Sequence, residues 1–128
     1  KWGRRIFIFV RHLGRRWRNT LTELSGHIKN LVAQGHVRIS EHGYDELVDD
    51  DLTAREIIAG VAGALLVEEY PDYPKGRCVL FLQKDHVGRP VHTVWGIPKG
   101  YDLPAVLVTA YRPHLNQWDA SFRRRMRR

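Results

Sequence analysis

The sequence of 128 residues contains a single cysteine, Cys78. One thiol excludes an internal disulfide and a cysteine-rich zinc site, which agrees with a reducing compartment. No apolar run approaches the roughly 20 residues of a membrane-spanning helix. The apolar residues 6–10 are closely bracketed by arginines, unlike the core of a signal peptide. We therefore expect a cytoplasmic protein with one domain, which is long enough to form a hydrophobic core without covalent cross-links.

Metal-binding and phosphate-loop motifs are also lacking. The pairs His36/His42 and His86/His92 have a spacing that fits neither helical nor hairpin metal ligands, and no carboxylate pattern accompanies them. No glycine-rich phosphate loop is present, since the glycines of residues 60–63 lie in a predicted helix and indicate close packing. We expect neither a metal nor a cofactor.

Acidic residues are scarce at both ends, so the net charge of +7 hides a strong segregation of positive and negative residues along the chain. Residues 1–38 contain nine Lys or Arg and one Asp or Glu. Residues 39–74 contain one Lys or Arg and ten Asp or Glu, and residues 75–128 contain eleven Lys or Arg and three Asp or Glu. Basic ends around an acidic middle favour a polyanion partner, with nucleic acid as the first choice. A soluble protein with a basic tail would show the same charges.

The charge and composition patterns divide the chain into three predicted regions. Residues 1–19 form a basic N-terminal arm, in which arginines alternate with Trp and Phe. This mixture suits RNA through stacking and phosphate contacts, although an extension without a role has the same composition. Residues 20–118 form a single α+β domain, and residues 119–128 form an Arg-rich C-terminal tail.

The first half of the domain has the pattern of three helices. The first is predicted from Thr20, where Thr20-x-x-Glu23 forms a capping box, to Gly35. The second begins after the cap Ser40 and continues to about residue 48. The third begins at the capping box Thr53-x-x-Glu56. The core face of the second helix is predicted to consist of Tyr44, Leu47 and Val48.

After residue 64 the hydrophobic pattern changes from helical spacing to strands. Four strands are predicted, over residues 65–70, 77–83, 91–97 and 105–112. Their connections are short, which forces antiparallel neighbours because a parallel crossover needs a dozen or more residues. We expect an α+β fold with the N-terminal helices packed on one face of a four-stranded antiparallel sheet. Residues 36–39 are expected to form only a short extended link.

His42 is the first candidate for chemistry. With Ser40 as the N-cap, His42 lies in the first turn of the second helix, where free N–H groups attract anions. A histidine at this position could move a proton beside a phosphate. A surface or capping histidine without a role fits the same sequence.

His92 is the second candidate, because a strand rarely places a lone histidine among apolar neighbours. If the last hairpin sets Ile97 opposite Pro104, then His92 lies opposite Thr109, with Tyr111 two residues along on the same face. A slip of one residue would separate them. In this register the three side chains form a polar cluster. A hydrogen bond inside the core would explain the same residues.

Four cations complete the candidate set: Arg38, Arg77, Lys99 and Arg112. They could bind phosphate and stabilise a pentavalent phosphorane, although each also fits an ordinary surface charge. Histidines with cations and no metal suggest cleavage of RNA by its own 2′-hydroxyl, which yields a 2′,3′-cyclic phosphate. His42 or His92 would take the hydroxyl proton, and the other imidazole or Tyr111 would protonate the leaving oxygen. The alternative is a nucleic-acid-binding or protein-binding module without catalysis.

Four motifs between about residues 37 and 118 carry a resemblance to a known family. They are RISEHGYDEL at 38–47, VEEYP at 67–71, GRPVHTVW at 88–95 and VTAYRP at 108–113. In this order they resemble the domain-of-unknown-function family 4258, which is grouped with the bacterial RelE/BrnT-like toxins.

The resemblance implies a RelE/barnase-like endoribonuclease fold, RNA as the substrate and a cognate antitoxin as a partner, in some members a zinc-finger protein. The expected function is therefore an endoribonuclease toxin of a toxin–antitoxin system. His42, His92 and Tyr111 match the family's recurring polar positions, with Thr109 beside them. Many members have an Arg four residues after the helix histidine, where this chain has Glu46. If that Arg binds phosphate, then Arg38 or Arg77 replaces it or the activity is lost.

Overall fold

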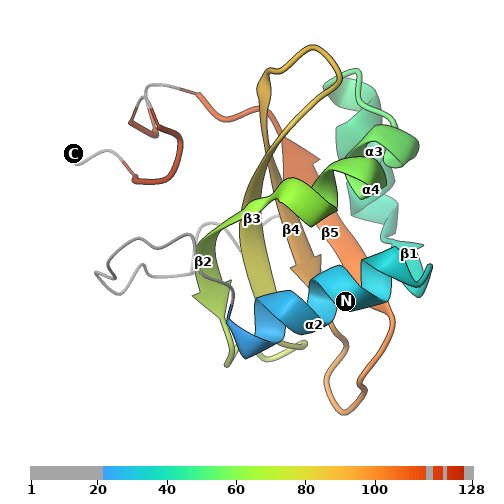
Figure 1. Cartoon of the computed structure of the whole chain (residues 1–128). Helices are drawn as coiled ribbons and strands as arrows, with labels where there is room; N and C mark the ends of the chain where they lie inside the picture. Colours follow the sequence, from blue (N-terminus) through green and yellow to red (C-terminus); the bar gives the residue numbers. More distant parts are fainter. Residues whose placement is uncertain (1–21, 115–116, 120, 126–128) are drawn as a thin grey trace.

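The structure, a computed structural model, describes residues 22–114, 117–119 and 121–125 (Figure 1). The elements in chain order are α2 (Glu23–Ala33), β1 (Val37–Ile39), α3 (Glu41–Asp49), α4 (Ala54–Gly60), the 3-10 helix η1 (Val61–Gly63), β2 (Leu65–Tyr70), β3 (Cys78–Lys84), β4 (Pro90–Gly96) and β5 (Ala105–Tyr111). Helices precede the meander of strands, so the predicted α+β class is confirmed.

The five strands form one mixed sheet in the order β1-β5-β4-β3-β2. Strands β2 to β5 are antiparallel neighbours, as predicted. The prediction of four antiparallel strands is wrong at one edge, where β1 pairs in parallel with β5 and Val37 lies beside Ala105. Three residues are too few to show an alternating pattern, and the partner strand lies at the far end of the domain. Reasoning from short connections therefore could not find this pair.

Helix α2 begins later than predicted. Thr22 is the N-cap and Ser25 completes the capping box, since the Thr22 Oγ1 accepts the Ser25 N–H at 3.1 Å and the Ser25 Oγ accepts the Thr22 N–H at 2.8 Å. The predicted box at Thr20 is therefore wrong, because the short serine side chain can replace Glu as the residue that reaches back. Thr20 itself lies outside the described residues. Gly35 follows the C-cap with φ +83° and ends the helix as predicted.

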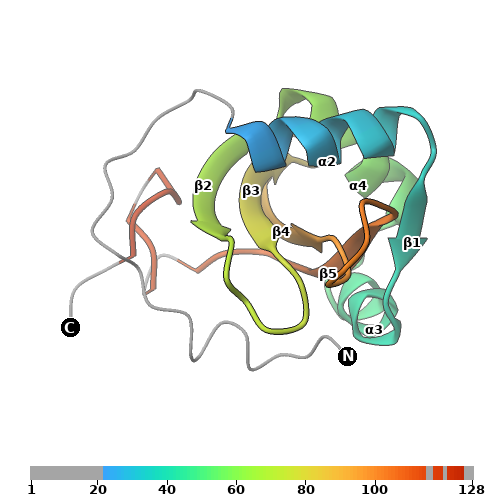
Figure 2. The same cartoon turned by 90° about the horizontal axis from the view of Figure 1, so that it is seen from below.

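Helices α2 and α4 pack on one face of the sheet, as predicted, and form the main core with it, whereas α3 packs along β5 (Figure 2). Ile28 of α2 and Ile57 of α4 have no exposed surface, and they pack in one cluster with Phe81 and Trp95 of the sheet. Figure 2 shows α2 crossing the sheet from the β2 side to the β1 side. A second, smaller cluster lies on the other face, which we call the outer face. It consists of Val67, Tyr70, Cys78, Leu80, Val94, Val108 and Trp118.

Helix α3 packs beside β5 through its glycine. Ser40 caps the helix as predicted, because its hydroxyl accepts the Gly43 N–H at 2.9 Å. A Cβ on Gly43 would lie 2.8 Å from the Leu107 carbonyl oxygen, so only glycine allows this approach. Gly43 and the buried Leu47, four residues apart, therefore face the sheet. The predicted core face is wrong for Tyr44 and Val48, which are 55% and 77% exposed.

Candidate polar site on the outer sheet face

Strands β4 and β5 bring three of the candidate residues onto the outer face. His92 pairs with Tyr111, and Val94 pairs with Thr109. The predicted partner of His92 was Thr109, so the predicted register is wrong by two residues from His92 to Val94 and by one residue beyond the irregularity between Val94 and Trp95. At His92 the shift of two keeps the paired side chains on the predicted face, because strands alternate with a period of two. His92, Thr109 and Tyr111 do share one face.

His92 is sealed in this position, with 0% of its surface exposed. Its Nε2 lies 2.7 Å from the Phe122 carbonyl oxygen, and its Nδ1 lies 3.2 Å from the Tyr111 hydroxyl. A carbonyl only accepts, so Nε2 carries the proton and Nδ1 accepts from Tyr111. The Trp118 ring lies edge-on at 4.4 Å between centroids. Burial lowers the pKa of His92 to about 4, so the ring is neutral.

A buried ion pair that sequence analysis missed lies beside these residues. Glu68 on β2 is 6% exposed, and its carboxylate accepts from Arg125 Nε at 3.0 Å and Nη2 at 2.9 Å. The Tyr70 hydroxyl donates to the same carboxylate, and burial followed by the Glu68 charge raises the pKa of Tyr70. The Arg125 guanidinium also lies 4.7 Å over the Trp118 ring. The sequence did contain a signal for this group: Glu68 lies two residues before Tyr70, and this spacing places both side chains on one face of a strand.

We call Glu68, Tyr70, His92, Tyr111 and Arg125 the outer-face cluster. It contains groups that could act as general acid and base, and several have pKa values shifted by burial and charge, as functional groups often do. The residues 117–119 and 121–125, which we call the C-terminal segment, supply Arg125 and lie against His92 and Glu68. In this arrangement an RNA hydroxyl cannot reach either nitrogen of His92. The contacts described hold the C-terminal segment on the sheet.

His42 lies apart from this cluster. It occupies the first turn of α3, and its Nε2 lies 3.7 Å from Glu46 Oε2. Glu46 is thus within ion-pair distance of the histidine. His92 contacts Tyr111, Trp118 and Phe122, none of which is a described partner of His42. Among the described contacts, the two imidazoles share neither a direct contact nor a partner.

The predicted phosphate-binding cations lie in three different places. Arg38 is exposed on the edge strand β1. Arg77 and Lys99 lie at the loops that join β2 to β3 and β4 to β5, where Arg77 pairs with Asp102 at 3.6 Å. Arg77 also lines a cavity of about 720 Å³ with His27, Asn30 and Glu69, which includes neither candidate histidine.

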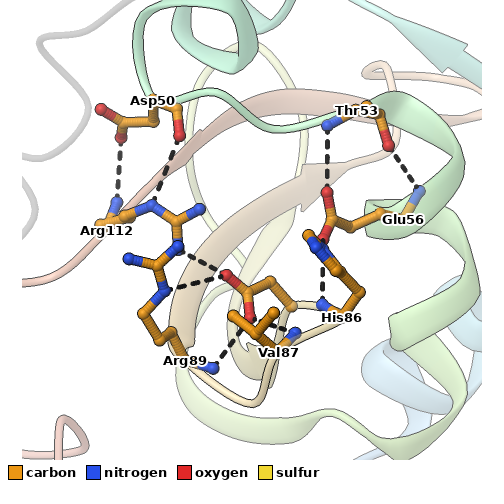
Figure 3. Close-up of polar contacts among 8 residues, drawn as sticks. Asp50, Thr53, Glu56, His86, Val87, Arg89 and Arg112 are labelled. Carbon is orange, nitrogen blue, oxygen red and sulfur yellow. Dashed lines mark hydrogen bonds and ion pairs between the residues drawn. The ribbon is translucent and has the colours of Figure 1, made fainter.

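Arg112, the fourth cation, is held by carboxylates at the opposite end of the sheet (Figure 3). Its Nη1 lies 2.8 Å from Asp85 Oδ2, and its backbone N–H donates to the Asp50 carboxylate at 3.0 Å. Burial would raise the pKa of Asp85, but hydrogen bonds from the Arg89 backbone, Arg112 and the Val87 backbone lower it to about 2. Asp85 is therefore ionised, and the Arg112 charge joins the β3–β4 turn to the loop after α3.

A second contact at the same turn involves His86 (Figure 3). Its Nδ1 lies 2.6 Å from Glu56 Oε2, and its backbone N–H donates to the same oxygen at 3.0 Å. Glu56 also completes the predicted capping box of α4 with Thr53, which is confirmed. The hydrogen bond that the His86 ring donates to the Glu56 carboxylate raises the pKa of His86. Both contacts fasten the turn to the helices.

Within the described ranges, no three His, Cys, Asp or Glu side chains are grouped to hold a metal ion. The same part of the chain contains no helix with the length and apolar content needed to cross a bilayer. The Cys78 thiol on β3 is buried, and burial raises its pKa to about 12, so it stays protonated.

Comparison with known proteins assigns a family. The family model described as "Domain of unknown function (DUF4258)" matches residues 39–112. No curated protein and no solved structure matches the chain. The matched residues include His42, Glu68 and His92 but not Arg125 or the N-terminal arm. The predicted family is confirmed, whereas the RelE/BrnT-like grouping stays a prediction. The chain belongs to the DUF4258 family of domains of unknown function.

Proposed function

We propose that the protein binds nucleic acid, with RNA as the first partner, through the basic segments at its two ends. The described residues contain twelve Lys or Arg and fourteen Asp or Glu, a net charge of −2. The remaining residues contain nine Lys or Arg and no acid, seven of them in residues 1–21. A polyanion is drawn to clustered positive charge, so this distribution supports binding by the ends.

The site geometry supports binding in preference to cleavage by two histidines. Such cleavage needs two exposed proton-transfer groups on either side of one phosphate. His92 is sealed under the C-terminal segment, and His42 pairs with Glu46 elsewhere. The Arg112 guanidinium is already paired with the Asp85 carboxylate. Binding by arginines and aromatic rings needs none of these groups.

RNA affinity measured against salt concentration tests the proposal. Single-stranded RNA is titrated with the wild type and with a variant in which Arg4, Arg5, Arg15 and Arg16 become Gln. The logarithm of the binding constant should fall with that of salt by about 0.7 for each phosphate neutralised, and the variant should lose most of this slope. A matched control changes four exposed cations of the folded domain to Gln: Arg38, Arg55, Lys75 and Lys99.

The control variant removes the same amount of positive charge. It therefore distinguishes an effect of the N-terminal arm on RNA affinity from an effect of the total net charge. It should keep most of the wild-type affinity, and the double variant His42→Ala/His92→Gln should also bind normally. Equal losses from the arm variant and the control would contradict binding by the ends. Unchanged affinity of the arm variant would contradict it as well.

A second candidate function is the endoribonuclease toxin implied by the family resemblance, with a cognate antitoxin as partner. It is favoured by Glu68, His92 and Tyr111 on one face, where Glu68 and His92 could serve as acid and base. Cleavage at this face would require the C-terminal segment to leave it. We therefore expect any activity to rise in Arg125→Gln and to vanish in Arg125→Gln/His92→Gln. Labelled RNA is incubated with each protein, and 2′,3′-cyclic phosphate ends are measured. RNA that stays intact with every protein would exclude this candidate.

A further inference from the structure

The outward surface of α3 consists of two adjacent rows of side chains. Tyr44 and Val48, four residues apart, form an apolar row and are among the few large apolar side chains exposed in the described chain. Glu41, Asp45 and Asp49, also four residues apart, form an exposed acidic row next to it. We call these five residues the α3 outer face. The opposite side of the helix, with Gly43 and Leu47, is buried against the sheet.

Exposure of this face to water alone has two energetic defects: the acidic row places like charges next to one another, and the apolar row stays solvated. Like charges at a spacing of four residues destabilise a helix by a few tenths of a kcal/mol per pair. The helix contains no Lys or Arg between Glu41 and Asp49 that would offset them. A basic segment with aromatic side chains would relieve both defects, because it would pair the carboxylates and cover Tyr44 and Val48.

The chain itself contains such a segment directly before α2. Residues 1–21 contain seven Lys or Arg and no acid, together with Trp2, Phe7, Phe9 and Trp17. An extended chain of this length reaches roughly 70 Å. The 11 residues of α2 that separate its start from the β1 side of the sheet span only about 16 Å. The segment is therefore long enough to reach α3.

We propose that the α3 outer face is a docking surface for residues 1–21 of the same chain. Arginines of this segment pair with the acidic row, and an aromatic side chain covers Tyr44 and Val48. Docking within one chain is favoured over docking between copies, because a short connection gives an effective concentration of about millimolar. If the proposed RNA binding holds, the folded domain and RNA compete for the same arginines.

Limited proteolysis of the full chain tests docking without RNA. Trypsin cuts after arginine, so a docked segment is cut more slowly than a free one. The variant Tyr44→Ser/Val48→Ser removes the apolar row without changing charge. Its matched control is Tyr101→Ser/Val87→Ser, which removes the same two residue types at positions 66% and 59% exposed. Cleavage within residues 1–21, followed by mass spectrometry, should be several-fold faster in the α3 variant and unchanged in the control.

Equal cleavage rates in the wild type, the α3 variant and the control would overturn the proposal. Protection that weakens when the wild type is diluted would also overturn it, because the occupant would then belong to a second copy. Far-ultraviolet circular dichroism of both variants should match the wild type, which shows that the domain is folded.

RNA titration separates this proposal from the proposed function on which its second part rests. With docking and RNA binding both correct, the α3 variant should bind RNA several-fold more tightly than the control, because more of the arm is free to bind. Faster cleavage with no RNA binding by any variant would support docking and reject the RNA partner. Tighter RNA binding with unchanged cleavage would overturn docking.

Discussion

Glu68 and Arg125 form a two-point ion pair between strand β2 and the C-terminal segment, with nitrogen–oxygen distances of 3.0 and 2.9 Å. The side chain of Glu68 is 3% exposed and that of Arg125 is 31% exposed. A buried carboxylate needs such a partner, because removing one charge leaves the other desolvated. The pair therefore fastens the segment that seals His92.

Replacing Arg125 should destabilise the protein. We expect Arg125→Ala to lower the free energy of unfolding by about 2–4 kcal/mol, since it leaves Glu68 buried without a counter-charge. The double variant Arg125→Ala/Glu68→Gln should recover part of this loss. Arg124→Ala, at an exposed neighbouring position, is the control and should cost less than about 0.5 kcal/mol. Urea unfolding followed by tryptophan fluorescence measures all three, and equal stabilities of Arg125→Ala and the control would contradict the role of the pair.

His92 should make stability depend on pH. Burial lowers its pKa to about 4, whereas an unfolded histidine titrates near 6.5. Between these values the unfolded chain binds a proton that the folded protein does not. The stabilisation is thus complete above pH 6.5 and is lost as the pH falls to about 4, by at most about 3 kcal/mol.

The variant His92→Gln should lose this dependence on pH. His86, whose pKa Glu56 raises, depends on pH in the opposite direction, so only the difference between variant and wild type isolates His92. His36→Gln, at an exposed position, should keep the wild-type profile. Chemical unfolding at several pH values from 4 to 8 gives the profiles, and identical profiles for His92→Gln and the wild type would refute the assignment.

Replacement by alanine should change the stability of the protein in opposite directions at two glycines. Gly43→Ala places a Cβ 2.8 Å from the backbone oxygen of Leu107, so α3 must move away from β5. We expect a loss of about 1–3 kcal/mol. Gly26 lies inside α2, where an added Cβ would meet no atom within 4 Å, and Gly26→Ala should stabilise the protein by about 0.5–1 kcal/mol. Thermal unfolding measures both, and a stable Gly43→Ala protein would show that α3 does not need this close contact.

Arg112 should contribute to the stability of the protein and not to its affinity for RNA. Because its guanidinium pairs with the Asp85 carboxylate and donates to the Asp50 carbonyl oxygen, Arg112→Ala should lower the melting temperature by several degrees and loosen the β3–β4 turn. Its RNA affinity should stay within about twofold of the wild type, since the charge is already neutralised. A large loss of RNA affinity with unchanged melting temperature would instead support Arg112 as a phosphate ligand.

Local signals determined several features of this protein. Ser40 at the start of α3, the capping box of Thr53 and Glu56, and Gly35 after α2 are all read from neighbouring residues, and the structure confirms them. The antiparallel order of β2 to β5 followed from short connections. The family was recognisable from four motifs. These features depend on hydrogen bonds and backbone angles over a few residues, which sequence spacing reports directly.

Tertiary packing decided the rest. Strand β1 exists only because β5 lies beside it, and α3 turns Tyr44 outward because Gly43 approaches β5 so closely. His92 and Glu68 are sealed because distant residues of the C-terminal segment, Arg125 among them, fold over them. Each of these outcomes joins segments far apart along the chain. Their contacts depend on which surfaces are complementary in three dimensions, and the spacing of neighbouring residues does not report that.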